Sequence, residues 1–326
     1  MRRWITRGAV AAAIAMLALG AAGGQTASKS WTAPRTPDGH PDLQGIWSNA
    51  TVTPLERPPE LAGKATLTAQ EAAVYEKQVI EQNDVDRRND KGTVNDVARA
   101  YNNAWYDRGT KVVKDRRTSL IVDPPDGRIP PLTPEAQKRA DERAESRRLH
   151  PADGPEDRAL NERCILNNTS GPPLMPGPYN NNYQIVETPQ AVLIFSEMIH
   201  EPRIVAMDRR EHLPASIRQW KGDSIGHWEG DTLVVDTTNF SDQTNFRGAS
   251  ENMHLVERFT RVDRDTLMYK FTVEDPTSFT RAWTAEIEST KSDGPILEYA
   301  CHEGNYSMTN LLSAARAEER KAGKGR

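Results

Sequence analysis

Residues 254–274 read HLVERFTRVDRDTLMYKFTVE, two runs of alternating apolar and polar residues separated by the short turn DRD. Successive side chains of a β-strand point to opposite faces, so this alternation predicts an antiparallel hairpin with one buried face. The buried face of the second strand is expected to comprise Leu267, Tyr269, Phe271 and Val273. In the first strand, the same parity places Glu257 between Leu255 and Phe259, inside the predicted sheet.

Short runs of the same kind lie on both sides of this hairpin. The further predicted strands cover residues 183–188, 191–199, 203–208, 224–228, 232–240, 279–289 and 296–302. About nine short strands with tight turns favour an antiparallel β-barrel or a curled meander. A closing helix is expected over residues 305–321.

The chain before residue 179 has a different character. Thr68 and Glu71 form a capping box, and Pro134 is a favourable first residue of a helix. The helices expected in this part cover residues 69–88, 97–106, 135–148 and 155–163. We therefore predict an α+β protein that folds as one unit. A helical, loop-rich covering segment (29–178) precedes a barrel-like sheet with a C-terminal helix (179–326).

Residues 1–28 are expected to be a secretory signal peptide rather than part of the fold. Arg2, Arg3 and Arg7 precede a short Ala-rich apolar run, which ends in small residues. The apolar run is short for a membrane span, which favours cleavage over anchoring. We expect a periplasmic or secreted protein with no membrane span after cleavage.

The composition narrows the class of protein. The 326 residues include 42 Lys and Arg and 46 Asp and Glu, so the formal net charge is −4. With a mean hydropathy of −0.71, the chain is not a multi-span membrane protein, and its charge argues against nucleic-acid binding. An apolar content of 37% allows a hydrophobic core with relatively few apolar residues. The 22 Pro residues, against six Phe, favour long ordered loops.

The chain has two cysteines, Cys164 and Cys301. In an oxidising compartment they are expected to form one disulfide, which would join the helical first half to the last predicted strand. Two unpaired thiols are the alternative.

Several polar residues are candidates for acid–base chemistry. A buried Glu257 requires a partner, and Arg281 shares the predicted inward face of its strand, so the two are expected to pair. Both residues lying at a solvated rim is the alternative. His200 ends a predicted strand just before Pro202 and is the preferred general base, because imidazole titrates near neutral pH. A solvent-facing His at a turn is the alternative.

Two segments, 101–108 and 178–183, combine aromatic rings with side-chain amides. Such segments suit sugars and oxygenated ring compounds, although they also serve to anchor loops. The predicted catalytic residues are His200, Glu257, Tyr106 and His302. The predicted substrate-binding residues are Arg108, Arg281, Tyr269, Trp283, Asn181 and Tyr183.

Other motifs carry less weight. Residues 222–226 read GDSIG, a match to the G-x-S-x-G nucleophile elbow around Ser224. The elbow requires a helix after the serine, whereas strand and hairpin residues follow here, so the match is judged accidental. The chain has no spacing typical of a metal site and no glycine-rich nucleotide loop, so neither a metal nor a cofactor is expected.

Three segments resemble a broad family of exported bacterial proteins of unassigned function. They are residues 101–131 with WYDRG and SLIVDPPDGRIP, residues 222–240 with WEGDTLVV, and residues 298–306, EYACHEGNY. This resemblance implies export but no activity. The sheet half is also similar in pattern to lipocalin-like barrels.

The main expectation is a cofactor-independent acid–base enzyme of the lyase, isomerase or hydratase type. Its substrate would be a small, oxygenated, partly apolar compound, with Arg281 or Arg108 stabilising oxyanion charge. The alternatives are a lipocalin-like periplasmic binding protein, a serine hydrolase that uses Ser224, and a structural role in the envelope.

Overall fold

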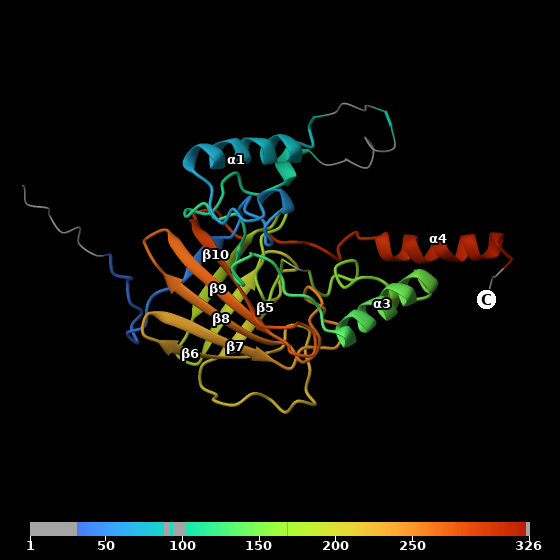
Figure 1. Ribbon diagram of the computed structural model, residues 1–326. Coiled ribbons are helices and arrows are strands. Elements are labelled where there is room, and N and C mark those ends of the chain that lie inside the picture. Colours follow the sequence, from blue (N-terminus) through green and yellow to red (C-terminus); the bar gives the residue numbers. More distant parts are fainter. Residues whose placement is uncertain (1–30, 88–91, 94–101, 168, 324–326) are drawn as a thin grey trace, which may run out of the picture. The chain divides into compact units, whose positions relative to one another are not determined.

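The structure is a computed structural model that describes residues 31–87, 92–93, 102–167 and 169–323. Its centre is a closed barrel of nine strands (Figure 1). The strands are β1 (Gly45–Ser48), β3 (Asn182–Glu187), β4 (Ala191–Ser196), β5 (Pro202–Ala206), β6 (Asp223–Glu229), β7 (Thr232–Thr238), β8 (His254–Arg261), β9 (Thr266–Glu274) and β10 (Trp283–Ser292). The predicted barrel is therefore confirmed. The expected signal peptide lies outside the described residues.

Strand β1 closes the barrel. It pairs antiparallel with β3 on one side and with the end of β10 on the other. A further strand, β2 (Ile121–Asp123), adds to β10 near its start. The strand predicted over 296–302 is wrong, because this segment is irregular and follows the end of β10. The barrel thus has the expected number of strands but a different closing strand.

The barrel is mixed rather than wholly antiparallel. Strands β5 and β6 run parallel, with Val205 opposite Ser224, whereas the other neighbouring barrel strands are antiparallel. The chain between β5 and β6 is long enough to return to the end of the barrel where β5 began. The expectation of a purely antiparallel sheet is corrected here, since alternating side chains specify faces and not strand direction.

Among the described residues, two α-helices come before β3 in the sequence and one follows β10. They are α1 (Ala69–Asn83), α3 (Pro134–Leu149) and α4 (Ser307–Lys321). The predicted capping box begins α1, where Thr68 accepts a hydrogen bond from the Glu71 amide. Short 3-10 turns (Asn103–Trp105 and Pro155–Asp157) occupy parts of two other expected helices. Residues 97–101 of the helix expected over 97–106 lie outside the described residues; the described part of residues 29–178 is mostly irregular and less helical than expected.

Apolar side chains fill the barrel. The face predicted to be buried in β9 is fully buried, and so are Leu255, Glu257 and Phe259 in β8. The largest aromatic side chains that are almost or completely inaccessible are Trp47, Tyr183, Phe240, Phe259, Tyr269, Phe271, Phe279 and Trp283. These residues belong to one continuous core, which occupies the space that a lipocalin-like protein would use for its ligand.

The extended arm that leads into β1 lines the end of the barrel near the β3–β4 and β6–β7 turns. Arg35 forms an ion pair with Asp231 at 2.6 Å, and the His40 ring stacks on Trp228 with 4.9 Å between centroids. The Leu43 amide donates a 2.6 Å hydrogen bond to Glu187. Burial raises the pKa of Glu187 to about 7, and the Asp42 charge acts in the same direction.

This raised pKa predicts a pH-dependent stability. The folded protein holds the Glu187 proton more tightly than the unfolded chain, so its contribution is complete below about pH 4.5 and is lost by about pH 7. Glu187→Gln should therefore raise the free energy of unfolding by about 1–3 kcal/mol at about pH 8 and change it little at about pH 4.5. Guanidinium denaturation at the two pH values measures this, with exposed Glu303→Gln as the control. Equal effects of Glu187→Gln at both pH values would contradict the assignment.

Candidate functional site

A buried ion pair occupies the barrel interior. Both Arg203 terminal nitrogens contact the Glu257 carboxylate, at 2.5 and 3.1 Å, and the Tyr269 hydroxyl donates to the same carboxylate at 2.7 Å. Tyr269 in turn accepts a hydrogen bond from the Leu174 amide. Burial raises the pKa of Tyr269, and the neighbouring Glu257 charge adds to this effect. Glu257 is fully buried, so the network is a structural centre that no substrate can reach directly.

The predicted site residues Glu257, Tyr183, Tyr269 and Trp283 are buried, and the expected pairing of Arg281 with Glu257 is wrong. Arg281 does not pair with Glu257, because it precedes β10, lies on the surface and forms an ion pair with Asp123 at 2.8 Å. Tyr183, Tyr269 and Trp283 are fully buried core residues rather than exposed ligand contacts. The Tyr183 hydroxyl is satisfied inside the barrel, where it donates to Ser289 at 2.7 Å.

The two predicted aromatic–amide segments meet at one end of the barrel. The Tyr106 ring lies 6.2 Å from the Tyr179 ring, which stacks on Tyr299 with 6.5 Å between centroids. The Arg108 guanidinium lies 3.9 Å from the centre of the Tyr106 ring. A backbone hydrogen bond from Asp107 to Pro178 joins the two segments. We call Tyr106, Arg108, Tyr179 and Tyr299 the aromatic cluster.

Asn181 holds these segments together instead of facing a ligand. Its side-chain nitrogen donates to the Asp107 and Gly177 carbonyl groups, and its oxygen accepts from the Gly177 amide at 2.7 Å. The residue is buried, and its amide has partners on both atoms. The predicted substrate contact of Asn181 is therefore corrected to a structural role.

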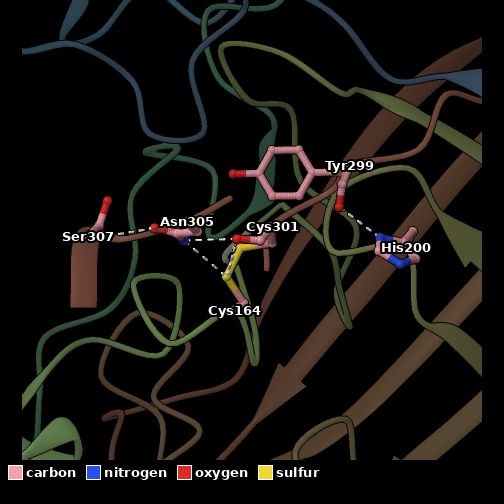
Figure 2. The surroundings of a disulfide bond; sticks show 6 residues. All are labelled: Cys164, His200, Tyr299, Cys301, Asn305 and Ser307. Atoms are coloured by element: carbon pink, nitrogen blue, oxygen red, sulfur yellow. Dashed lines mark hydrogen bonds between the residues drawn. A yellow bond between two sulfur atoms is a disulfide. The ribbon is translucent and has the colours of Figure 1, made fainter. Parts of the chain in front are cut away.

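His200 contacts the backbone of Tyr299, one member of the aromatic cluster (Figure 2). Its Nδ1 atom is 2.8 Å from the Tyr299 carbonyl oxygen, which fixes this nitrogen as the donor and leaves Nε2 with the lone pair. Ile199 and His200 have positive φ angles of 64° and 32°. A β-branched residue in this region is strained, and such strain clusters at functional sites.

The disulfide supports the carbonyl that orients His200. Cys164 and Cys301 are bonded, as predicted, and Cys301 follows Tyr299 by two residues (Figure 2). The Asn305 side chain donates to the Cys301 carbonyl at 2.8 Å. Cys301 lies in a loop rather than in the last strand, so the bond joins two irregular segments. His302 is exposed in the same loop.

Two carboxylates, Glu197 and Asp107, influence each other in this part of the structure. Buried Glu197 accepts hydrogen bonds from the Leu297 amide at 2.9 Å and from the Asn182 side chain at 3.0 Å. It thereby anchors the segment that carries Tyr299. Partial burial and then the Glu197 charge raise the pKa of Asp107, although much of Asp107 remains exposed.

A cavity of about 310 Å³ lies next to the aromatic cluster. Its lining includes Arg108, Arg247 and the turn Pro176–Pro178. Arg108 also donates to the Asn83 carbonyl at 2.7 Å, which holds its guanidinium at the cavity. The predicted binding residue Arg108 is thus placed where a small ligand would fit, with aromatic rings beside it.

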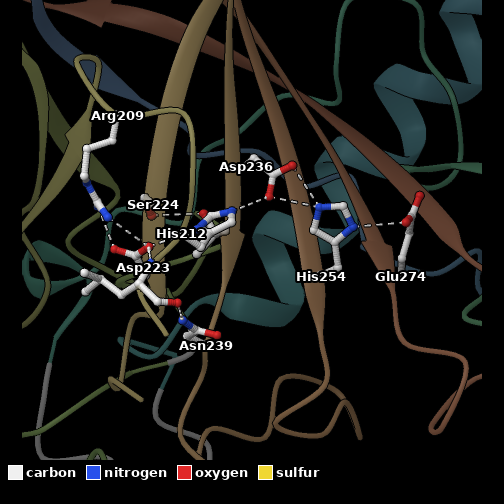
Figure 3. A network of polar contacts seen from close by, with 10 residues as sticks. Arg209, His212, Asp223, Ser224, Asp236, Asn239, His254 and Glu274 are labelled. Carbon is white, nitrogen blue, oxygen red and sulfur yellow. Dashed lines mark hydrogen bonds and ion pairs between the residues drawn. The ribbon is translucent and has the colours of Figure 1, made fainter. Parts of the chain in front are cut away.

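Ser224 lies in β6, and its side chain faces inward. It is buried, and its hydroxyl is 3.0 Å from that of Thr237. The nearby His212 instead contacts Asp223 and Asp236, both at 3.0 Å (Figure 3). This arrangement lacks the exposed serine and the adjacent imidazole that a nucleophile elbow requires.

Figure 3 shows a chain of charges that the sequence reasoning missed. Arg209 contacts Asp223 at 2.8 Å, and His254 bridges Asp236 and Glu274 at 3.0 and 3.1 Å. The hydrogen bond between the His254 ring and the Asp236 carboxylate raises the pKa of His254. The pairing of His254 with Glu274 follows from the hairpin register, whereas His212 comes from a loop without any such pattern.

Comparisons with protein families, with curated proteins and with solved structures found no match. Among the described residues, no group of three His, Cys, Asp or Glu side chains is arranged to hold a metal ion. Nor does the described part of the chain contain a helix long and apolar enough to cross a membrane.

Proposed function

We propose that this protein is a cofactor-independent acid–base enzyme of the lyase, isomerase or hydratase type, with His200 as its general base. The observation that carries the proposal is the fixed imidazole. The Tyr299 carbonyl occupies Nδ1, and Nε2 has no hydrogen-bond partner among the described residues. A neutral imidazole held in this way presents the lone pair of Nε2 as a proton acceptor.

The aromatic cluster supports a small, oxygenated, partly apolar substrate. Aromatic rings offer flat apolar contacts, and the Tyr106 and Tyr299 hydroxyl groups offer directional hydrogen bonds. Arg108 supplies a permanent positive charge at the adjacent cavity. In the proposed reaction, His200 removes a proton next to a carbonyl group while Arg108 stabilises the developing oxyanion.

Export to a periplasmic or extracellular compartment is part of this proposal. A disulfide between Cys164 and Cys301 supports an oxidising environment, because cytosolic thiols are usually kept reduced. Mass measurement of the mature protein from the periplasmic fraction would test export and the expected cleavage near residue 28.

The proposal predicts exchange of carbon-bound hydrogen. In D₂O, wild-type protein should accelerate deuterium incorporation next to the carbonyl group of one or more compounds in a panel of small cyclic ketones and lactones. His200→Gln should lower that rate by about 10²–10⁴-fold, as expected for the loss of a general base. NMR spectroscopy follows the exchange directly and does not require the natural substrate.

His227→Gln is the matched control, because His227 is an exposed imidazole in the β6–β7 hairpin, paired with Glu229. This variant should keep the wild-type rate. Exchange at the same rate in His200→Gln and wild-type protein would remove His200 as the base. Failure of wild-type protein to exchange any compound in the panel would count against the enzyme class.

The alternatives receive less support. A lipocalin-like protein holds its ligand inside the barrel, and here the interior is occupied by Trp47, Tyr269 and other core side chains. A serine hydrolase requires an accessible nucleophile, whereas Ser224 is buried against Thr237. We therefore favour the His200 site over both.

A further inference from the structure

A second cavity, of about 620 Å³, lies apart from the residues of the His200 site. It is bordered by the C-terminal part of α3, by residues within 156–167, by Gly171 and Pro172, and by the loop at 242–246. Its volume is within the usual range for small-molecule sites, about 300–1,000 Å³. No step of the proposed acid–base reaction uses this cavity.

Arginine dominates the ionisable lining of this cavity. The ionisable lining residues are Arg143, Arg147, Arg158 and Arg163, the carboxylates Glu156, Asp157 and Asp242, and His150. Two of the carboxylates already accept hydrogen bonds, since Asp157 contacts the Gly154 amide at 2.7 Å and Asp242 the Ser241 hydroxyl at 3.4 Å. Neither forms an ion pair with a lining arginine among the described residues.

The four arginines differ in their partners. Arg158 pairs with Glu162 at 2.7 Å, and Arg143 donates to the Asp242 carbonyl at 3.0 Å. The side chains of Arg147 and Arg163 have no hydrogen bond or ion pair within the described part of the chain. A guanidinium group carries five N–H donors, so many N–H groups of these arginines have no acceptor within the protein.

Two of the unused donors are buried. Arg163 Nη1 and Arg158 Nε are inaccessible to solvent and have no acceptor. Leaving such a donor unsatisfied costs about 1–3 kcal/mol, and more for a charged group. These two donors are closed off from the cavity, so an oxyanion there would bind the remaining, accessible donors of the lining arginines with charge-assisted, often bidentate hydrogen bonds.

We propose that this arginine-lined cavity binds a small organic anion with at least two carboxylate or phosphate groups. Multiple acidic groups match guanidinium groups that come from both α3 and residues 156–167. Leu160, Leu166 and Phe246 provide apolar lining for the carbon skeleton of the ligand. The site does not depend on His200 or on the proposed reaction.

Isothermal titration with citrate and, separately, with inorganic phosphate tests this site at ionic strength matched with sodium chloride. At least one probe should bind the full-length protein with a Kd below about 1 mM. Arg163→Gln and Arg147→Gln should each weaken that binding about tenfold or more. Citrate binding alone would identify carboxylates as the preferred groups, and phosphate binding alone would identify phosphates.

Arg210→Gln is the control, because Arg210 is an exposed arginine outside this cavity. It should bind the probes like wild-type protein. Arg147 is exposed on α3, so its variant should fold normally and keeps the test decisive if Arg163→Gln does not fold. Absence of binding by both probes would overturn the proposal. So would equal weakening in all three variants, because this indicates a nonspecific effect of surface charge.

Discussion

Arg203→Met should lower the free energy of unfolding by about 3–5 kcal/mol, because it leaves the Glu257 carboxylate buried without its cation. Glu257 is inaccessible to solvent, and the Arg203 side chain is 6% exposed. Tyr269 would remain as a hydrogen-bond donor, but one hydroxyl group does not replace a bidentate guanidinium. Guanidinium denaturation followed by tryptophan fluorescence measures the change.

A double variant distinguishes the cost of leaving Glu257 buried without a partner from the net contribution of the Arg203–Glu257 pair to stability. Arg203→Met combined with Glu257→Leu removes both charges, so it should recover most of the stability lost in Arg203→Met. A small loss in Arg203→Met, below about 1 kcal/mol, or a double variant no more stable than the single, would contradict this account.

The surface pair Arg258–Glu229 is a matched control, because Arg258 lies on β8, the strand that carries Glu257. Both of its side chains are substantially exposed, and exposed ion pairs contribute little. Arg258→Met should therefore change the free energy of unfolding by less than about 1 kcal/mol.

Replacing both cysteines with serine should lower the free energy of unfolding by about 5 kcal/mol. The Cys164–Cys301 bond spans 137 residues, and closing a chain loop of that length restricts the unfolded ensemble strongly. The same loss is expected when wild-type protein is treated with a reductant. Denaturation curves of the double variant, with and without the reductant, measure the effect.

The double variant also has an internal control, because the reductant should not change its stability further. A loss below about 1 kcal/mol would show that the bond does not form or that the unfolded chain is already compact. If the loop also orients Tyr299, the deuterium exchange expected from His200 should fall in the variant under conditions where it remains folded.

The hairpin at residues 254–274 was predictable because side-chain parity alone determines which residues enter a core. Parity placed Glu257 inside correctly, but it carries no information about partners across a barrel. Arg203 lies in β5, far from Glu257 in sequence, and only the closed barrel brings them together. Arg281 was wrongly assigned because the alternation of β10 was extended past its start at Trp283.

The closing strand β1 was not predicted from the sequence, for a different reason. Strand β1 has only four residues, in a segment rich in Pro and Gly, and so it lacks a measurable alternation. Residues 296–302 were apolar enough to resemble a strand, but the disulfide and the hydrogen bonds to Glu197 and His200 hold that segment elsewhere. At the candidate site, sequence identified His200 and the aromatic segments. The positive φ angles and the Tyr299 carbonyl that orient His200 required the structure.

Closure of the barrel by β1 has a consequence for the order in which this protein is made. Ile46 pairs with Gln184 on one side and with Ser292 on the other. The hydrogen bonds of β1 can therefore be completed only after β10, near the end of the chain, has been synthesised. Until then, its backbone edge is available to other unpaired strands. Chains that stop before β10 cannot form this pairing, so the exposed edge of β1 would make them prone to aggregation.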